Sequence, residues 1–342
     1  MTGAPPSGDG GGDAEEGSTK DDEDDDAEET GDPSSSDESG TSTSGGTTTG
    51  VSSASSSSTS TSTSTSTSGG ATTGTSSDDT TSTSTTGDGT EEGGDSNDSS
   101  RPTSGCGSSP PASGRFDIDV DGTTREYILK VPDDYDPNHP YPIVFAWHPR
   151  GGSAEQVATG FGGGYYGLES LANGSAIFVS PEGIDAGWAN PGGRDIAFTR
   201  AMIERFTAEL CIDESRLFST GFSYGGMMSF AIACELGDLF RAIAPMSGAL
   251  YSGCMDRDFP IAMMGWHGDD DEIVPLSDGE AGRDVVAANN HCDGSTVPHD
   301  VSPCVEYTGC DEGYPTVWCE FQGGHTPAQN AAQPIWAFFS QF

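Results

Sequence analysis

The first hundred residues contain no Phe, Trp, Tyr, Leu, Ile or Cys, so they lack the side chains that form most of a hydrophobic core. They consist instead of acidic runs such as DDEDDDAEE and polar runs such as TSTSTSTSTS, with 22 acidic residues against the single basic Lys20. Ordering such a backbone costs about 1 to 2 kcal/mol per residue, and no apolar burial offsets that cost. We therefore expect residues 1 to 104 to form an extended, self-repelling, disordered stalk or linker.

Basic residues are scarce in the whole chain, which has 13 Lys and Arg against 55 Asp and Glu. So acidic a chain repels phosphate backbones and anionic lipid surfaces, and we expect no nucleic-acid partner. No run of about 18 apolar residues is present, so the sequence predicts no membrane-spanning helix. Met1 is not followed by the basic and apolar segments of an export signal, and we expect such a signal to have been removed or to lie outside this sequence.

Cysteine is absent before Cys106, and all eight cysteines lie from that residue onward. No two of them have the Cys-x-x-Cys spacing that is typical of zinc sites and redox motifs. An even number of cysteines spread through one domain favours disulfides and hence an oxidising compartment. We therefore expect an extracellular protein, secreted or tethered at the cell surface, that needs neither a metal ion nor an organic cofactor.

Residues 105 to 342 have the length and pattern of one α/β domain. Two alternating runs joined by Asp121-Gly122 predict an N-terminal antiparallel hairpin, and the short apolar runs that follow are typical of strands buried on both faces. The expected strands are 116–120, 124–131, 142–147, 176–180, 216–221, 241–246 and 261–266, with a last apolar run at 316–321, and the expected helices are 195–210, 224–236 and 277–289. This alternation predicts a doubly wound, mostly parallel sheet with its ligand crevice beyond the carboxyl ends of the strands.

The segment Gly221-Phe222-Ser223-Tyr224-Gly225 fits the nucleophile elbow, in which a strand turns sharply into a helix and presents a serine hydroxyl. The match alone is weak, because the chain contains 49 glycines and many serines. Its position supports it, since Ser223 falls between an expected strand and an expected helix. A serine hydroxyl is a poor nucleophile at neutral pH, so it needs a base and a carboxylate that orients the base.

In the α/β-hydrolase arrangement the acid and then the histidine follow the serine along the chain. Asp269, Asp270 and Asp271 follow the expected strand 261–266 and are candidates for the acid. His325 follows the last apolar run in a glycine-containing loop that can return over Ser223, and we predict that it is the base. The other histidines after Ser223 are His267, at a strand end, and His291 and His299, for which we expect surface or packing roles.

The oxyanion that forms on an ester carbonyl needs two converging N–H donors. We expect one from Tyr224, directly after the serine. The other should come from the loop after strand 142–147, where Pro149 has no N–H, so Arg150 or Gly151 remains. For His148 we expect a role in bracing this loop rather than a role as a second base.

Ordered sequence blocks extend through most of residues 105 to 342. They are GCG at 105–107, REYILKVPDDYDP at 125–137, RGGS at 150–153, YYGLESLANGSAIFVSPEG at 165–183, GWANPGGRD at 187–195, RLFSTGFSYGGMMSFAIACE at 216–235, SGC at 252–254, YTGCDEGYPTVW at 307–318 and GGHTP at 323–327. In these blocks the chain resembles the secreted feruloyl esterases of fungal plant-cell-wall degraders, a family related to polyhydroxybutyrate-depolymerase-like esterases.

The resemblance implies an α/β-hydrolase with a triad of Ser223, Asp271 and His325. Asp271 is favoured among the three aspartates because it stands four residues after His267, as in the family's His-Gly-x-x-Asp loop. The resemblance also implies that Trp188 and Asn190 flank an aromatic acyl group.

The chain departs from the family pattern in three places. The segment HPRGG stands where the family more often has His-Trp-Arg-Gly-Gly, which affects the second oxyanion donor, and the acidic stalk has no counterpart. Cys304 and Cys319 are additional to six family cysteines and flank an expected hairpin, so we pair them with each other and pair Cys292 with Cys310. The remaining cysteines, which allow three connectivities, are Cys106, Cys211, Cys234 and Cys254.

Together these features predict a monomeric serine esterase that releases ferulic or related hydroxycinnamic acids from feruloylated arabinoxylan through an acyl-enzyme. One rival is an acetyl-xylan esterase or polyhydroxyalkanoate depolymerase with the same triad and a different acyl pocket. Another is a non-catalytic carbohydrate-binding surface protein that keeps the fold. The presence of all three triad residue types in the expected order weighs against the second rival.

Overall fold

The computed structural model describes residues 100–254 and 259–342. The predicted stalk, except for residues 100–104, lies outside the described residues. None of the described helices is both long enough and apolar enough to cross a membrane.

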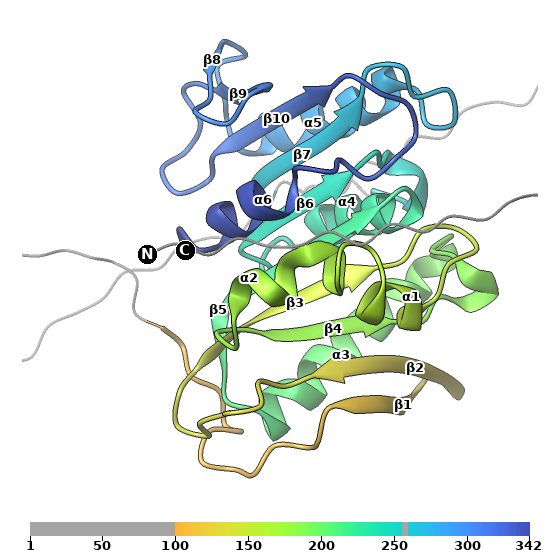
Figure 1. The fold of residues 1–342 in the computed structure, drawn as a ribbon, viewed down its shortest axis with the longest axis vertical. Coiled ribbons are helices and arrows are strands. Elements are labelled where there is room, and N and C mark those ends of the chain that lie inside the picture. The colour runs from red at the N-terminus through yellow and green to blue at the C-terminus, as the bar shows by residue number, and fades with distance from the viewer. Residues whose placement is uncertain (1–99, 255–258) are drawn as a thin grey trace, which may run out of the picture. The chain divides into compact units, whose positions relative to one another are not determined.

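A single mixed sheet of ten strands organises the described part of the chain, in the order β1-β2-β4-β3-β5-β6-β7-β10-β9-β8 (Figure 1). The strands are β1 Gly114–Val120, β2 Thr123–Lys130, β3 Tyr141–Trp147, β4 Ile177–Pro181, β5 Ile212–Phe222, β6 Ala242–Met246, β7 Ala262–Gly268, β8 Thr296–Pro298, β9 Cys304–Tyr307 and β10 Thr316–Phe321. The six strands from β4 to β10 in this order run parallel, while β1, β2, β9 and β8 pair antiparallel at the two margins. The predicted doubly wound, mostly parallel sheet is confirmed.

Helices cover both faces of the sheet, because the inner strands are apolar on both faces. In β3, Ile143, Phe145 and Trp147 belong to one core cluster, whereas Val144 and Ala146 belong to the other. Residues of α3, α4 and α5 complete the first cluster and residues of α1, α2 and α6 the second; Figure 1 shows α2 and α6 in front of the sheet and α3, α4 and α5 behind it. The helices are α1 Ala154–Thr159, α2 Leu168–Ala172, α3 Arg194–Glu209, α4 Tyr224–Leu236, α5 Leu276–Asn289 and α6 Ala332–Phe339.

The first hairpin forms where the sequence predicts it. Asp121 and Gly122 connect β1 to β2 with φ angles of 52° and 79°, the left-handed conformation that a two-residue turn between antiparallel strands requires. The second strand of the hairpin, β2, also pairs with β4, so the hairpin forms one margin of the sheet.

The folded domain begins before Gly105, the boundary predicted from the sequence. The Arg101 N–H donates to Asp213 Oδ1 at 2.8 Å, and the Thr103 hydroxyl donates to the Leu210 carbonyl at 2.6 Å. Composition changes at Gly105, but these few polar residues upstream are held by hydrogen bonds rather than by apolar burial.

Four disulfides use all eight cysteines. Two are the expected pairs, Cys292–Cys310 and Cys304–Cys319, and the second joins residues that face each other across β9 and β10. For the four cysteines left open by the sequence, the structure has Cys106–Cys211 and Cys234–Cys254.

Candidate active site

Ser223 stands on a strained turn between β5 and α4. Its φ and ψ are 55° and −117°, a backbone conformation that costs a residue with a side chain about 1 to 3 kcal/mol. The flanking glycines allow the turn: a Cβ on Gly221 would lie 2.6 Å from the Gly225 carbonyl carbon, and a Cβ on Gly225 would lie 2.1 Å from the Trp147 carbonyl oxygen. The Ser223 N–H donates to the Met246 carbonyl of the neighbouring strand at 2.9 Å, so the elbow is fixed to the sheet.

His325 lies on the loop after β10 and reaches back to the elbow. Its Nε2 is 2.8 Å from Ser223 Oγ, and its Nδ1 is 2.7 Å from Asp271 Oδ2. The ring also packs against Phe222, with ring centroids 4.8 Å apart. Three loops that are far apart in the sequence therefore bring these residues into one hydrogen-bonded chain, at the carboxyl ends of β5, β7 and β10.

Asp271 is the buried member of the three consecutive aspartates. Its Oδ1 accepts hydrogen bonds from the Ile273 and Val274 N–H groups at 3.0 and 2.9 Å, while Asp269 and Asp270 are exposed. Burial by itself raises the pKa of Asp271, but the hydrogen bonds from His325 and the two backbone groups outweigh it, so the pKa lies below its usual value. The carboxylate therefore stays ionised beside the imidazole.

His267 braces the loop that carries Asp271. The ring is fully buried, and its Nε2 donates to the Val274 carbonyl at 2.9 Å while lying 3.6 Å from Asp271 Oδ2. The sequence identified its position at a strand end but not this role. The other two histidines after Ser223 lie elsewhere: His291 pairs with Asp311 at 2.8 Å, and His299 accepts from the Val301 N–H at 3.1 Å.

Two backbone N–H groups remain candidates for the expected oxyanion donors. Tyr224 is the first residue of α4, so its N–H has no partner within the helix. In the loop after β3, the Gly151 N–H donates to the Ala186 carbonyl at 2.8 Å and is therefore occupied. No hydrogen bond of the Arg150 N–H is found among the described residues, so of the two alternatives Arg150 is the available donor.

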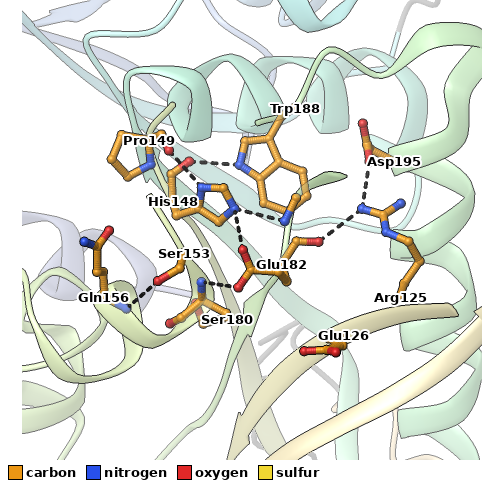
Figure 2. Close-up of polar contacts among 12 residues, drawn as sticks. Arg125, Glu126, His148, Pro149, Ser153, Gln156, Ser180, Glu182, Trp188 and Asp195 are labelled. Atoms are coloured by element: carbon orange, nitrogen blue, oxygen red, sulfur yellow. Dashed lines mark hydrogen bonds and ion pairs between the residues drawn. The ribbon is translucent and has the colours of Figure 1, made fainter. Parts of the chain in front are cut away.

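His148 is the first residue after β3, and its ring makes hydrogen bonds that fix this loop (Figure 2). The ring is fully buried; its Nδ1 donates to the Pro149 carbonyl at 2.8 Å and its Nε2 accepts from the Gly183 N–H at 2.9 Å. Burial lowers the pKa of His148, although the Pro149 carbonyl and the nearby Glu182 carboxylate act in the opposite direction. The ring thus stays neutral and braces its loop, which is the role expected from the sequence.

Glu182 ties this loop to the end of β4. One carboxylate oxygen accepts from the Ala154 N–H at 2.9 Å, at the start of α1, and the other lies 3.8 Å from His148 Nε2 (Figure 2). Behind it, the buried Arg125 guanidinium donates to the Glu182 carbonyl at 3.2 Å and to Asp195 at 2.8 Å. Sequence reasoning missed Glu182, whose only signal is its place directly after an apolar strand.

Trp188 and Asn190 do not have the free surfaces that the resemblance implied. Trp188 is fully buried against Trp147, and its Nε1–H donates to the His148 carbonyl at 2.9 Å. Asn190 uses its side-chain oxygen to accept from the Asp195 N–H at 2.9 Å and its amide nitrogen to donate to the Ser252 carbonyl at 3.0 Å. The expectation that Trp188 flanks an acyl group is corrected, because its ring is fully buried. Asn190 is half-buried and holds two loops together, and a contact with an acyl group remains a prediction for it.

A cavity of about 520 Å³ lies next to the His325 loop on the α6 face of the sheet. It is mostly apolar, and Ser223 and Tyr224 are not among the residues that line it. Those residues are Phe161, Gly162, Tyr166, Gly167, Met246, Thr326, Pro327, Ala328, Gln329, Ala331, Ala332 and Ile335. Within residues 100–254 and 259–342, no three His, Cys, Asp or Glu side chains are arranged to hold a metal ion.

Comparison with known proteins identifies relatives that match most of the described chain. Residues 184–276, which include Ser223 and Asp271, match the prolyl oligopeptidase family, Peptidase_S9. Feruloyl esterase D of Neurospora crassa is 38% identical over 266 residues, covering 71% of this chain and 92% of the relative. Probable feruloyl esterase C of Aspergillus niger is 40% identical over 248 residues, covering 69% of this chain and 90% of the relative.

Solved structures share the fold at lower sequence identity. The acetyl xylan esterase from Aspergillus awamori superimposes with a TM-score of 0.53 at 16% identity, over 66% of this chain and 99% of the other. A ferulic acid esterase superimposes with a TM-score of 0.50 at 15% identity, over 66% of this chain and 96% of the other. The predicted α/β-hydrolase fold is thereby confirmed.

Proposed function

Because the chain belongs to the feruloyl esterase family, we propose that it is a serine esterase that releases ferulic or related hydroxycinnamic acids from feruloylated arabinoxylan. The observation that carries the proposal is the continuous hydrogen-bonded chain from Ser223 Oγ through His325 to Asp271. Relatives named feruloyl esterase, nearly 40% identical and matched over about nine tenths of their length, support the choice of substrate.

Acylation begins when Ser223 Oγ attacks the ester carbonyl carbon. His325 Nε2 takes the hydroxyl proton, and Asp271 stabilises the imidazolium that results. The carbonyl oxygen becomes an oxyanion, for which the Tyr224 and Arg150 N–H groups are the proposed donors. The intermediate collapses as the ester bond to the sugar oxygen breaks, and that oxygen leaves with the proton held by His325.

Deacylation repeats the same steps with water as the nucleophile. His325 Nε2 accepts a proton from water as its oxygen attacks the acyl carbon, forming a second oxyanion in the same place. Collapse breaks the bond to Ser223 Oγ, which regains its proton from His325. The hydroxycinnamic acid is released, and no metal ion or organic cofactor takes part in this scheme.

Reaction with a fluorophosphonate, combined with hydrolysis of methyl ferulate, tests the proposal. Wild type should be labelled and should hydrolyse methyl ferulate, whereas Ser223→Ala should do neither. Ser340→Ala, which changes an exposed serine at the end of α6, is the matched control and should behave as wild type. Equal labelling of wild type and Ser223→Ala would remove Ser223 from its proposed role.

Parallel assays with acetylated xylan and a short-chain polyhydroxyalkanoate test the substrate. We expect hydroxycinnamate esters to be hydrolysed with the highest kcat/KM. Turnover of acetyl esters alone would contradict the proposed substrate while leaving the proposed triad intact.

We also propose that the enzyme acts outside the cell as a monomer. The four disulfides support an oxidising environment. The excess of 55 acidic over 13 basic residues argues against a nucleic-acid partner.

A further inference from the structure

Few large hydrophobic side chains of the described residues are exposed, and two of them lie beside the candidate active site. Tyr251 is 57% exposed and Ile273 is 70% exposed, and they occupy the loops that follow β6 and β7. Ser223 lies at the same edge of the sheet, because β5, β6 and β7 run parallel. The other two exposed side chains are Leu171, at 37%, and Val297, at 46%.

The two segments that carry these side chains also contribute to a small apolar cluster with α4, the helix after the elbow. The cluster consists of Met227, Ala249 and Val274, and Tyr224 packs both against it and against the core that includes α3, α4 and α5. Ala249 precedes Tyr251 by two residues, Val274 follows Ile273, and Tyr224 follows the proposed nucleophile. The cluster therefore connects the start of α4, next to Ser223, with the two segments that carry the exposed side chains.

The loops that carry the two side chains are anchored. The Tyr251 hydroxyl donates to the Asp278 carboxylate in the first turn of α5, and the Ile273 N–H donates to Asp271 Oδ1 at 3.0 Å. These hydrogen bonds engage the Tyr251 hydroxyl and the Ile273 backbone. The Tyr251 ring and the Ile273 aliphatic side chain remain partly exposed to solvent. Ligand sites combine apolar side chains with a few fixed polar groups, and these two side chains lie at the same edge of the sheet as the triad.

We infer that Tyr251 and Ile273, here called the rim patch, bind the aromatic ring of the hydroxycinnamoyl group. The inference rests on the proposed function and extends it to the residues that select the acyl group. A hydroxycinnamoyl ring is flat and apolar and gains from contact with an aromatic face and an aliphatic branch. A sugar ring, by contrast, also needs hydrogen-bond partners for its hydroxyls. Ile273 has no polar group in its side chain, and the Tyr251 hydroxyl already donates to Asp278.

The rim patch suits the ring better than the cavity of about 520 Å³ beside the His325 loop. That cavity is lined by Phe161 and Tyr166 on the α6 face and by residues after His325, but not by Ser223 or Tyr224. The apolar cluster to which the rim patch segments contribute, in contrast, has Tyr224 packed against it, the residue bonded to the proposed nucleophile.

Hydrolysis of methyl ferulate and 4-nitrophenyl acetate by two variants tests the inference. Both esters use the same proposed triad, but only methyl ferulate has an aromatic ring in its acyl group, the part that the rim patch is proposed to bind. The ring of 4-nitrophenyl acetate is in the leaving group, and its acyl group is acetyl. For Tyr251→Ala and Ile273→Ser we expect kcat/KM on methyl ferulate to fall about tenfold, mainly through a higher KM. Turnover of 4-nitrophenyl acetate should stay within about twofold of wild type, which shows that the fold and the proposed triad are intact.

Two further variants make the test specific. Val297→Ser changes another exposed aliphatic side chain, on β8, and should leave both activities unchanged. Phe161→Ala removes an aromatic side chain from the rival cavity and should also leave them unchanged.

Each contrary result overturns the inference in a distinct way. If wild type is active and Tyr251→Ala and Ile273→Ser hydrolyse methyl ferulate equally well, the rim patch does not bind the ring. The proposed function would still hold. A loss confined to Phe161→Ala would place the ring in the cavity. A loss confined to feruloylated arabinoxylan would make the rim patch a sugar site. A wild type that ignores methyl ferulate would overturn the proposed substrate and the rim patch together.

Discussion

The two sides of Ser223 differ in how much of their surface is already in use. On the oxyanion-loop side, His148 and Trp188 are fully buried, and hydrogen bonds connect the loop after β3 to the loop after β4. On the acid-loop side, Asp271 is equally well held, but Tyr251 and Ile273 stand 57% and 70% exposed above it. One side is closed by its own contacts, and the other presents side chains to solvent.

This difference matches two physical requirements of a hydrolase. Donors that stabilise an oxyanion must already be in position before the charge develops, so their loop gains from dense internal hydrogen bonding. Recognition of an acyl group requires apolar side chains that remain accessible until the substrate arrives. The chemistry is therefore held by buried polar contacts, and we propose that selectivity resides in the open apolar ones.

Among variants on the two sides of Ser223, the largest loss of activity should come from a change of Asp271, the buried carboxylate on the acid-loop side. Asp271→Asn removes the charge that stabilises the imidazolium and favours the wrong tautomer of His325, so we expect kcat on methyl ferulate to fall about 10⁴-fold. The Ile273 and Val274 N–H groups still have an oxygen to donate to, so the loop should remain in place. Asp269→Asn is the matched control, because Asp269 is exposed and does not contact His325. Equal losses in the two variants would contradict the assignment of Asp271.

A smaller loss of activity should follow when the oxyanion-loop side loses one of its hydrogen bonds. Glu182→Ala removes the acceptor for the Ala154 N–H, and the loop that carries Arg150 loses one anchor. Because the proposed donor is displaced rather than removed, we expect kcat to fall about tenfold with KM nearly unchanged. Glu182→Gln keeps a carbonyl oxygen at this position and should retain most of the activity.

Glu126 provides the control for Glu182. Both carboxylates lie near Arg115, at 3.2 Å for Glu126 and 3.9 Å for Glu182, but only Glu182 contacts His148 and Ala154. Glu126→Ala should therefore hydrolyse methyl ferulate as wild type does. If Glu126→Ala and Glu182→Ala lost the same amount of activity, the effect would belong to Arg115 and not to the oxyanion loop.

The smallest effect on activity should come from a site away from both sides. Cys304 and Cys319 close a loop of 15 residues between β9 and β10. Replacing both by alanine should lower the free energy of unfolding by about 3 kcal/mol, since the unfolded chain becomes less restricted. Denaturant unfolding should show this loss while kcat and KM at low temperature stay unchanged. A parallel loss of kcat would mean that this margin of the sheet supports the active site.

The sequence predicted the parts of the molecule that depend on local pattern. The inner strands were visible as short apolar runs and the hairpin β1–β2 as alternation around Asp121-Gly122, and both are present. The order of Ser223 and His325 followed from the elbow and from the glycine-containing loop after the last apolar run. The choice of Asp271 among three consecutive aspartates required the family resemblance. The three differ in burial, which the sequence alone does not reveal.

Features that depend on tertiary contacts were not predictable in this way. The short strand β8 and the helices α1, α2 and α6 were not identified, since each is too short for its periodicity to be clear. The strand β9 was expected only as one arm of the hairpin flanked by Cys304 and Cys319. The family resemblance implied that Trp188 contacts substrate, yet its ring is fully buried and its Nε1–H donates to the His148 carbonyl. The role of Glu182 arises from contacts between segments that adjacency in sequence does not reveal.

The strand β8 has a consequence for the behaviour of this protein in solution. An unpaired outer strand is a template on which another chain can add by backbone pairing. Here the outer strand is three exposed residues long and ends in Pro298, whose nitrogen cannot donate a hydrogen bond. At the opposite margin, β1 presents the exposed charges of Asp117 and Asp119. Neither end of the sheet therefore offers a long, uncharged ladder, which protects a concentrated preparation against edge-to-edge aggregation.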